Sequence, residues 1–565
     1  MAGTLRVIKI RFHAGPRPGA SPLEIQPGSV VIFVGPNNSG KSLALREVED
    51  WCFGIDARRK VVDAVEIDFP DKPDVAEGLL RRFETPPRAS DSPLRNGFYV
   101  GQHRFRRDQP TGYFGVDLNE LRQAVLAKNE AHLRAWLTSS YTVRLDGRTR
   151  FMLSDPQPTG DLQMHPQNHL WALFKDDAAR ERVRKLTEDA FDLHFVIDPT
   201  AMQQFRIRMS SRPPASKSEE QALDEAARRF HYEAPLITTL GDGVQAFVGL
   251  VSAVLSLPHK IILIDEPDAY LHPPLARRLG ADLAGIAHER NASLVVATHS
   301  ADFLTGCLEA VNDATIVRFT YAAGVATARQ LSPSELTEMT RDPLLRSTEL
   351  FRTLFHNGAV VGEADSDRAF YDEINQRLLD SNRGIRDALF LNAQNRQTIH
   401  RLIRPLRRIG IPVAAIVDLD LLQENTTNWE RLLDACQVDK GQYDAIEKVR
   451  TYLSDILSTV QQAGQKLPIK MGGLNLLSTT DKTEAEKLLK YLSSYGLFLV
   501  PQGELETWLA KMEAKGHGSD WVVDIFSKMG QSGTGNYLRP EDDDVWKFID
   551  DIASWSDNPE RLGID

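Results

Sequence analysis

The sequence is poor in cysteine and has no long apolar run. Its 565 residues include only Cys52, Cys307 and Cys436, which lie far apart. That spacing fits neither a disulfide framework nor a zinc site built from paired cysteines. No stretch reaches the ~18 consecutive apolar residues of a membrane span, and the first twelve residues lack the apolar core of a signal peptide. These absences predict a soluble protein of a reducing compartment, the cytoplasm, with no membrane partner.

An excess of positive charge is also lacking. Lys and Arg number 67 against 78 Asp and Glu, so the net charge is −11. This balance does not by itself indicate a nucleic-acid partner, although local basic patches rather than the mean charge decide such binding. Hydrophobic residues make up 42% and charged residues 26% of the chain, which is typical of globular proteins. At ~100–200 residues per domain, the length predicts two to four domains.

A buried strand followed by a glycine-rich loop is the most specific motif. The run VVIFV (30–34) predicts a buried parallel strand, and LALREVEDW (43–51) predicts a helix. Between them stands G-x-x-x-x-G-K-S, a phosphate-binding loop in which backbone N–H groups face phosphate, the lysine reaches the β- and γ-phosphates, and the serine hydroxyl binds Mg²⁺. We therefore expect ATP and Mg²⁺ at Gly35, Asn37, Asn38, Ser39, Gly40, Lys41 and Ser42.

Two later strands end in residues suited to nucleotide hydrolysis. KIILI (260–264) precedes Asp265 and Glu266, and SLVVAT (293–298) precedes His299. Asp265 is expected to hold Mg²⁺, Glu266 to act as general base on water, and His299 to sense the γ-phosphate. A solvated strand end, or a packed imidazole in the case of His299, is the structural alternative.

The spacing of these motifs resembles that of ABC-type ATPases of chromosome maintenance and DNA repair. More than 200 residues separate Lys41 from Asp265, and long insertions at this point are typical of those enzymes. LGDGVQ (240–245) resembles their signature loop, with Gly241 where serine is usual. The resemblance implies that Gly243 presents its backbone to the nucleotide of a second protomer, and therefore that the chain dimerises around ATP. An ordinary helix N-terminus is the alternative.

The resemblance also implies a nucleotide-contacting glutamine between the phosphate-binding loop and the signature loop. Gln102 in YVGQHRF is the candidate. Gln109 and Gln157 are alternatives that the sequence does not exclude.

Beyond residue 358 the chain predicts a second α/β region with carboxylates at its strand ends. Glu363 follows one expected strand, and Asp418 and Asp420 end another. Side chains two apart in an extended chain point to the same face, so the three carboxylates are expected to meet at one sheet edge. Carboxylates this close repel one another unless cations neutralise them. Mg²⁺ or Mn²⁺, which prefer oxygen ligands, are the expected cations. Two such ions about 4 Å apart can hydrolyse a phosphodiester. The alternative is that these carboxylates are ordinary acidic residues of surface loops.

This second region resembles a Toprim domain, whose motif is E-G-x-x-D followed by DxD. Here Ala364 replaces the glycine. The resemblance implies Asp367 as a further metal ligand, with Asp365 as the alternative. GLFLVPQGELETWL (496–509) resembles the later acidic motif, which implies Glu506 as a ligand with Glu504 behind it; a helix-capping role is equally open. The lysine expected near such a site is Lys466, Lys470 or Lys482.

An ABC-type ATPase followed by a Toprim domain is the architecture of the OLD (overcoming lysogenization defect) family of nucleases, which the chain resembles from about residue 5 to 510. We expect an α/β ATPase domain at 1–345 with an inserted helical lobe at about 115–235, a Toprim domain at 346–510, and a helical or irregular extension at 511–565.

The family resemblance implies a DNA endonuclease that binds and hydrolyses ATP and needs Mg²⁺ or Mn²⁺, acting in bacterial anti-phage defence. Family members form homodimers or higher oligomers through the ATPase domain, and some act with a helicase or reverse-transcriptase partner. The alternative is an ATPase sensor or scaffold whose Toprim half binds nucleic acid or a partner without cleaving. Four basic residues at helical spacing either line a DNA channel or form a solvated face: Arg401, Arg404, Arg407 and Arg408.

Overall fold

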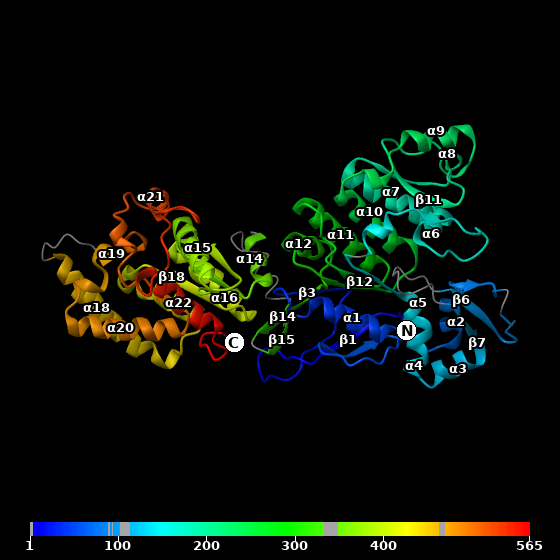
Figure 1. The fold of residues 1–565 in the computed structure, drawn as a ribbon. Helices are drawn as coiled ribbons and strands as arrows, with labels where there is room; N and C mark the ends of the chain where they lie inside the picture. Colours follow the sequence, from blue (N-terminus) through cyan, green and yellow to red (C-terminus); the bar gives the residue numbers. More distant parts are fainter. Residues whose placement is uncertain are drawn as a thin grey trace. The chain divides into compact units, whose positions relative to one another are not determined.

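The computed structural model describes residues 4–88, 91–92, 94–101, 113–147, 149–322, 324–332, 348–462 and 469–564. The chain divides into two compact units, Met1–Leu331 and Ser332–Asp565. Many of their helices and strands are labelled in Figure 1. Among the described residues, no helix is both long enough and apolar enough to cross a bilayer.

The first unit is built on a six-stranded sheet with strand order β15-β14-β3-β13-β12-β8. All neighbours are parallel except β14 and β15. The strands are β3 (Val30–Val34), β8 (Thr142–Leu145), β12 (Ile261–Asp265), β13 (Ser293–Ala297), β14 (Thr315–Ala322) and β15 (Val325–Leu331). Because β3 and β13 are buried along their whole length, the continuous apolar runs of the sequence correspond to strands covered on both faces.

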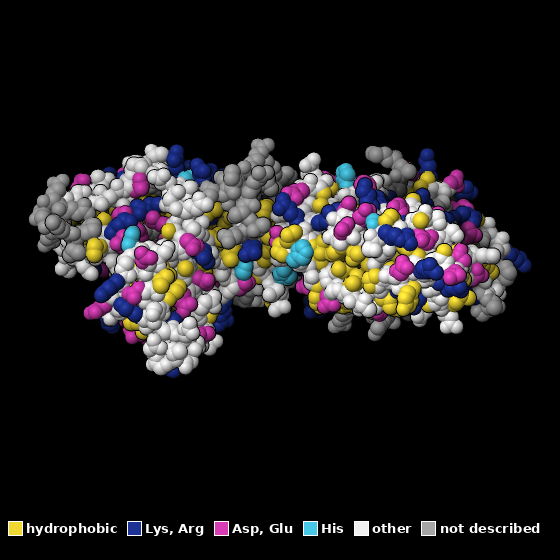
Figure 2. Space-filling model, turned by 90° about the horizontal axis from the view of Figure 1, so that it is seen from above, with side chains coloured by type: hydrophobic (Ala, Val, Ile, Leu, Met, Phe, Trp, Pro, Cys, Tyr) yellow, Lys and Arg dark blue, Asp and Glu magenta, His cyan; other side chains and the backbone are white. Residues whose placement is uncertain are grey.

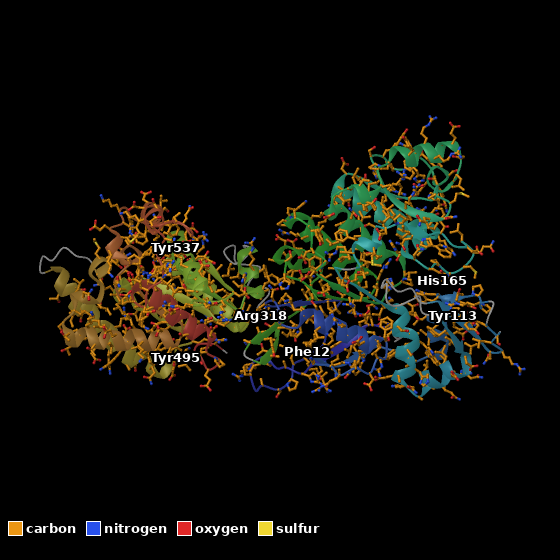
Figure 3. The ribbon with its side chains drawn as sticks, viewed as in Figure 1. Phe12, Tyr113, His165, Arg318, Tyr495 and Tyr537 are labelled. Atoms are coloured by element: carbon orange, nitrogen blue, oxygen red, sulfur yellow. The ribbon has the colours of Figure 1, made fainter. Side chains whose placement is uncertain are left out.

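Helices and a small antiparallel sheet cover the two faces of this sheet. On one face lie α1 (Lys41–Cys52) and the sheet of β1 (Val7–Phe12), β2 (Glu24–Ile25) and β4 (Val62–Ile67). Phe12, labelled in Figure 3, packs edge to face against Phe33 and Phe319. On the other face Figure 1 shows α10 (Asp242–Ser256), α11 (Pro273–Glu289) and α12 (Ala301–Ala310). Helix α10 is apolar nearly all round and is buried accordingly.

The region between β4 and α10 contains strands as well as helices. Its strands outside the main sheet are β5 (Glu84–Thr85), β6 (Gly97–Gly101), β7 (Tyr113–Asp117), β9 (Gln157–Pro158), β10 (His194–Asp198) and β11 (Gln204–Ser210). Its helices are α2 (Pro73–Arg81), α3 (Leu118–Leu126), α4 (Glu130–Leu133), α5 (Ser139–Tyr141), α6 (His169–Lys175), α7 (Asp177–Phe191), α8 (Lys217–Gln221) and α9 (Glu225–Glu233). This region also supplies β8 to the main sheet.

The second unit contains a four-stranded parallel sheet with order β17-β16-β18-β19. The strands are β16 (Gly358–Gly362), β17 (Ala388–Asn392), β18 (Val413–Val417) and β19 (Leu497–Leu499). The helices are α14 (Thr348–Arg352), α15 (Asp365–Asp380), α16 (Ile399–Arg408), α17 (Thr426–Ala435), α18 (Tyr443–Gln462), α19 (Ile469–Gly472), α20 (Thr479–Ser494), α21 (Ser519–Met529) and α22 (Asp544–Asp557). Since all four strands run the same way, their carboxyl ends share one edge.

The segment beyond residue 510, from which the sequence predicts no chemistry, completes the core of the second unit. Trp521 of α21 and Trp546 of α22 are buried against the sheet and α15. Trp508 is buried beside them, and its indole N–H donates to the Tyr371 hydroxyl at 3.0 Å.

Arg407 is the exception to the basic face expected on α16. Its guanidinium is fully buried, and its hydrogen bonds to described residues go to the backbone carbonyls of Val413, Cys436, Tyr495, Gly496 and Gly563. The expectation that it faces DNA or solvent is therefore wrong. Arg401 is exposed, and Arg404 lies 3.6 Å from Asp434.

Replacing this buried arginine should destabilise the second unit. Arg407→Leu leaves several buried carbonyls without a donor, and each such group costs about 1–3 kcal/mol. We expect a loss of at least about 3 kcal/mol, seen as a lower midpoint of thermal unfolding followed by tryptophan fluorescence. Arg401→Leu, an exposed change on the same helix, is the matched control and should leave the midpoint nearly unchanged. Equal midpoints for the two variants would contradict this role of Arg407.

Candidate functional site

The phosphate-binding loop has a backbone that requires glycine. Gly35 and Gly40 have φ values of 141° and 100°. A Cβ atom on Gly35 would lie 2.1 Å from the Phe319 carbonyl oxygen. The helix α1 begins at Lys41, directly after Gly40. The loop therefore delivers the N-terminus of α1 to the carboxyl end of β3, the geometry that binds phosphate.

Lys41 and Ser42 connect this loop to its surroundings. The Lys41 ammonium is buried and donates to the carbonyls of Gly35 (2.8 Å) and Pro36 (2.7 Å). The Ser42 hydroxyl donates to Asp265 Oδ1 at 3.0 Å, which joins α1 to the end of β12. Burial raises the pKa of Asp265. A hydroxyl beside a desolvated carboxylate is an oxygen-only donor set that fits Mg²⁺.

A buried arginine holds the turn after β12. Glu266 is exposed there with φ 51°, and its N–H donates to the Ala297 carbonyl of β13 at 2.8 Å. The Arg150 guanidinium donates to the Ala269 carbonyl at 3.1 Å and also to that of Glu266. Sequence reasoning missed Arg150, since an arginine in a region expected to be an inserted lobe gives no signal of contact with a strand end more than 100 residues away.

His299 lies at the same edge of the sheet. It follows β13, and the preceding Thr298 donates its hydroxyl to Asp268 Oδ1 at 2.6 Å. The phosphate-binding loop, Asp265, Glu266 and His299 thus lie at the carboxyl ends of three adjacent strands, β3, β12 and β13.

The expected signature loop opens α10. Gly241 is its exposed N-cap residue, and Gly243 lies in the first turn. A Cβ atom on Gly243 would come within 3.0 Å of the Tyr270 carbonyl oxygen, whereas one on Gly241 would meet nothing within 4 Å. Gly243 is therefore held close to the loop after β12, while Gly241 faces open space.

The candidate for the nucleotide-contacting glutamine stays a prediction. Gln102 and Gln109 lie outside the described residues. Gln157 lies in β9, which pairs with β11, and its amide donates to the carbonyls of Met152 (3.2 Å) and Asp155 (3.0 Å). On the side away from β13, the strand that pairs with β12 is β8, and β8 is followed by Asp146.

Asp146 is a carboxylate that sequence reasoning missed at the nucleotide edge. Ile264 pairs with Leu145, so the next residues along the two strands are Asp265 and Asp146. Buried Arg144 lies 2.7 Å from Glu49 of α1 and 3.0 Å from Asp146. The four-residue strand TVRL contains this arginine, and the run therefore has no apolar pattern that would reveal a strand.

In the second unit, carboxylates gather at the carboxyl edge of the sheet. Glu363, after β16, accepts the Asp418 N–H at 3.1 Å and the Arg396 Nε–H at 2.8 Å. Asp420 pairs with Nη2 of the same arginine. Lys470 Nζ lies 3.1 Å from Asp418, 3.5 Å from Asp420 and 3.7 Å from Glu504. Carboxylates following three strands are therefore linked by two cations.

Asp418 and Asp420 both contact Lys470. The expectation that they share a face because the chain is extended there is wrong. Strand β18 ends at Val417, and Asp420 lies in a 3₁₀ turn, Leu419–Gln423, rather than in extended chain. The Leu419 N–H donates to the Gly503 carbonyl at 2.9 Å, which fixes this turn against the loop after β19.

Asp367 faces this group and Asp365 does not. Asp367 accepts the Ala364 N–H at 2.8 Å in the first turn of α15. Burial raises the pKa of Asp367 to about 6, and Glu363 and Glu506 add to the effect. The Asp365 side chain is 69% exposed and pairs with Arg368.

The acidic group still lacks positive charge. Burial first, then Glu363, raises the pKa of Asp418 to about 7 despite the nearby Lys470. Burial, followed by the neighbouring Glu506, raises the pKa of Glu504. Oxygen-only donors whose ionised forms are disfavoured by burial and mutual repulsion fit a hard divalent cation such as Mg²⁺ or Mn²⁺.

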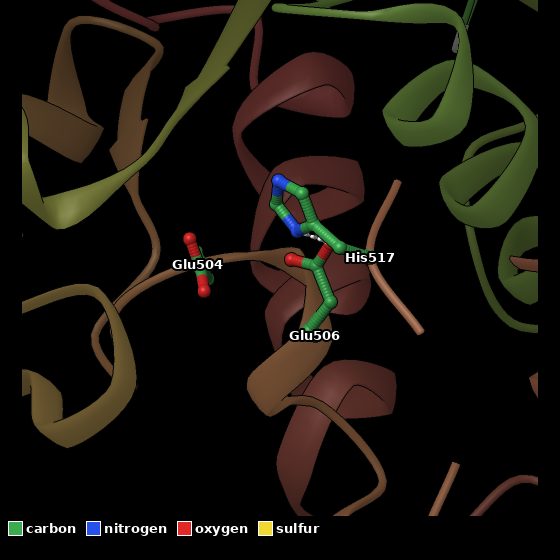
Figure 4. Close-up of side chains that lie close together, drawn as sticks. All are labelled: Glu504, Glu506 and His517. Carbon is green, nitrogen blue, oxygen red and sulfur yellow. Dashed lines mark ion pairs between the residues drawn. The ribbon is translucent and has the colours of Figure 1, made fainter. Parts of the chain in front are cut away.

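Glu504, Glu506 and His517 form a further cluster, drawn in Figure 4. One donor atom of each lies within 4.8 Å of the others. Glu506 pairs with His517 Nδ1 and accepts the Gly518 N–H at 2.7 Å. It is Glu504, not Glu506, that shares Lys470 with Asp418.

Of the three candidate lysines, the structure brings Lys470 to the carboxylates. Lys482 donates to Asn475 at 2.9 Å and lines a separate groove of about 1170 Å³ between α20 and α22. Lys466 lies outside the described residues. The sequence does not identify Lys470, because the contact depends on α19 packing beside the loop after β19.

Comparisons with known proteins match the two regions separately. Residues 30–305 match the family described as "AAA domain, putative AbiEii toxin, Type IV TA system". Residues 354–420 match "Overcoming lysogenization defect protein-like, TOPRIM domain". No curated protein sequence matches the chain.

Two solved structures with similarity to the chain are SMC heads. The head domain from Thermotoga maritima is 15% identical, with 58% of this chain and 100% of that chain covered and a TM-score of 0.28. The SMC head bound to the C-terminal winged-helix domain of ScpA is 13% identical, with 59% and 99% covered and a TM-score of 0.33.

The two family matches follow one another along the chain in the order expected from its motifs. The first contains the phosphate-binding loop, Asp265, Glu266 and His299, and the second contains Glu363, Asp418 and Asp420. With an ATPase domain followed by an OLD-like Toprim domain, the chain has the ATPase–Toprim architecture of the OLD (overcoming lysogenization defect) family.

Proposed function

We propose that the protein is an ATP-hydrolysing, divalent-metal-dependent DNA endonuclease of the OLD type. The observation that carries this proposal is the meeting of Glu363, Asp418 and Asp420 at one edge of a parallel sheet. Its ATPase–Toprim architecture supports the pairing of a nucleotide site with a phosphodiester-cleaving site.

In the first unit, we assign hydrolysis of ATP to residues at the ends of β3, β12 and β13. Lys41 binds the β- and γ-phosphates, and Ser42 and Asp265 hold Mg²⁺. Glu266 takes a proton from the attacking water, and His299 contacts the γ-phosphate. Arg150 positions Glu266 through its backbone. Asp146 is a further candidate for the Mg²⁺ or its water.

In the second unit, we assign metal binding to Glu363, Asp367, Asp418 and Asp420, with Glu504 and Glu506 on the side of β19. Divalent cations held there supply Lewis acidity and lower the pKa of bound water. We assign contact with the scissile phosphate to Lys470, whose ammonium lies 3.1 Å from Asp418 and 3.7 Å from Glu504.

The proposed partners follow from the family and the charge. We propose DNA as substrate and a homodimer or higher oligomer assembled through the ATPase domain, in anti-phage defence, with a helicase or reverse transcriptase as a further partner. Figure 2 shows Lys and Arg side chains intermingled with Asp and Glu on the face in view. DNA binding therefore depends on local arrangement of basic residues rather than on the net charge of −11.

One observation favours an alternative function. Arg396 and Lys470 already neutralise part of the acidic group, and a Toprim half that binds nucleic acid or a partner without cleaving would show the same pairing. The sensor or scaffold role is distinguished by the absence of cleavage.

Glu266→Gln should bind ATP but hydrolyse it at least about 100-fold more slowly, because the general base is lost while the shape of the side chain is kept. Phosphate release and nucleotide binding measure the two effects. Glu225→Gln, at an exposed position on α9, is the control and should hydrolyse ATP at the parent rate. An unchanged rate in Glu266→Gln removes the residue from the base role.

Gly241→Arg should abolish ATP-dependent dimerisation and reduce hydrolysis to a similar extent. The exposed backbone at Gly241 has φ −61° and open space around a Cβ atom. The new side chain should therefore disturb contact with a second protomer and not the fold of the protomer that carries it. Light scattering in a Glu266→Gln background measures assembly. Gly78→Arg, equally unobstructed on α2, should assemble normally. Normal assembly of the Gly241 variant would argue against a nucleotide-sandwich dimer.

Asp418→Asn should lose nicking of supercoiled plasmid by at least about 100-fold and bind Mn²⁺ more weakly. Asp434→Asn, a more exposed carboxylate of the same unit, is the control.

The parent should also bind Mn²⁺ more weakly at pH 6 than at pH 8, because protons compete for Asp418, whose metal-free pKa is about 7. Absence of parent nicking with either metal in every nucleotide state would favour the sensor role.

A further inference from the structure

Arg396 occupies a position that neither the motifs nor the proposed roles explain. It follows β17, the edge strand of the Toprim sheet, and begins the 3₁₀ turn Arg396–Thr398. The Ala393 N–H donates to the Gly362 carbonyl at 3.1 Å, which holds this loop against the end of β16. The loop thereby brings a guanidinium to the same edge as the carboxylates that follow β16 and β18.

Every nitrogen of this guanidinium faces a carboxylate. Nε lies 2.8 Å from Glu363, Nη2 pairs with Asp420 and lies 3.9 Å from Asp418, and Nη1 lies 3.9 Å from Glu424. The Arg396 side chain is only 16% exposed. Three of these four carboxylates, Glu363, Asp418 and Asp420, are among those assigned to the metal.

A cation bound to the same oxygens would be too close to this guanidinium. Mg²⁺ and Mn²⁺ bind carboxylate oxygens at about 2.0–2.2 Å. An ion at that distance from Glu363 and Asp420 would lie within about 5 Å of the guanidinium, and at this separation the two positive charges repel each other strongly in a site shielded from water. The oxygens that bind Arg396 cannot serve both partners at full strength.

We propose that Arg396 is an internal counter-ion that holds the Toprim carboxylates together in the metal-free protein and must be displaced when divalent metal binds. The guanidinium and the metal compete for Glu363 and Asp420, and this competition sets the metal concentration at which the site fills. The inference rests on the proposed metal site.

Removing the charge of Arg396 should have opposite effects on metal affinity and on stability. In Arg396→Gln, Mn²⁺ binding should become about tenfold tighter or more, because a competing charge is lost. The midpoint of thermal unfolding without metal should fall, because the carboxylates then repel one another. The increase in that midpoint on adding Mn²⁺ should be larger than in the parent. A residue that merely positions the carboxylates would give weaker metal binding instead.

The experiment is a titration of the full chain with Mn²⁺, with free Mn²⁺ followed by electron paramagnetic resonance, alongside thermal unfolding with and without the ion. Arg401→Gln, an exposed arginine on the neighbouring helix α16, is the matched control and should bind like the parent. Arg396→Lys keeps the charge and should bind Mn²⁺ nearer to the parent affinity than Arg396→Gln does. This comparison remains available if Arg396→Gln folds poorly.

The outcomes separate the inference from the proposed function. Tighter binding in Arg396→Gln, with Arg396→Lys near the parent, supports the inference. Equal or weaker binding in Arg396→Gln, with a parent that binds Mn²⁺, overturns it and leaves the metal site standing. If Arg396→Lys binds as tightly as a well-folded Arg396→Gln, charge is not the cause and the inference also fails. If neither parent nor variant binds Mn²⁺, the metal site itself is refuted.

Discussion

Both units depend on the convergence of parallel strands at one edge. When neighbouring strands run the same way, the residues that follow them come together however far apart they lie in the sequence. In the first unit this places the phosphate-binding loop beside Asp265, Glu266 and His299. In the second it brings Glu363 to the backbone of Asp418. Each unit thereby concentrates negative charge, and that charge must be balanced.

The two units balance this charge in different ways. In the first, the Ser42 hydroxyl meets Asp265, and Arg144 lies between Glu49 and Asp146. In the second, Arg396 and Lys470 enter the acidic group directly, yet burial and repulsion still raise the pKa of Asp418 to about 7. The remaining deficit of positive charge makes the second edge suited to a divalent cation.

Buried arginines that bind backbone carbonyls hold several of these loops in place. Arg150 fixes the turn after β12 on which Glu266 lies, and Arg407 joins α16, the start of β18, the end of α20 and the C-terminal segment. Arginine suits this task, because its planar group presents five donors that water would otherwise satisfy. The segment beyond residue 510 is therefore part of the second unit's core, although its sequence predicts no chemistry.

The sequence by itself determined the elements whose chemistry is local. Continuous β-branched runs, the glycine pattern of the phosphate-binding loop and carboxylates at strand ends predicted the α/β class and the acidic groups of both units. The order of an ATPase and a Toprim domain followed from the resemblance of these motifs to known families. Tertiary structure alone decided which charges face one another. Asp146, Arg150, Arg396 and Lys470 reach their sites through strand order and loop packing. Contacts between residues distant in sequence leave no periodic trace in the chain, because they arise only when separate elements pack.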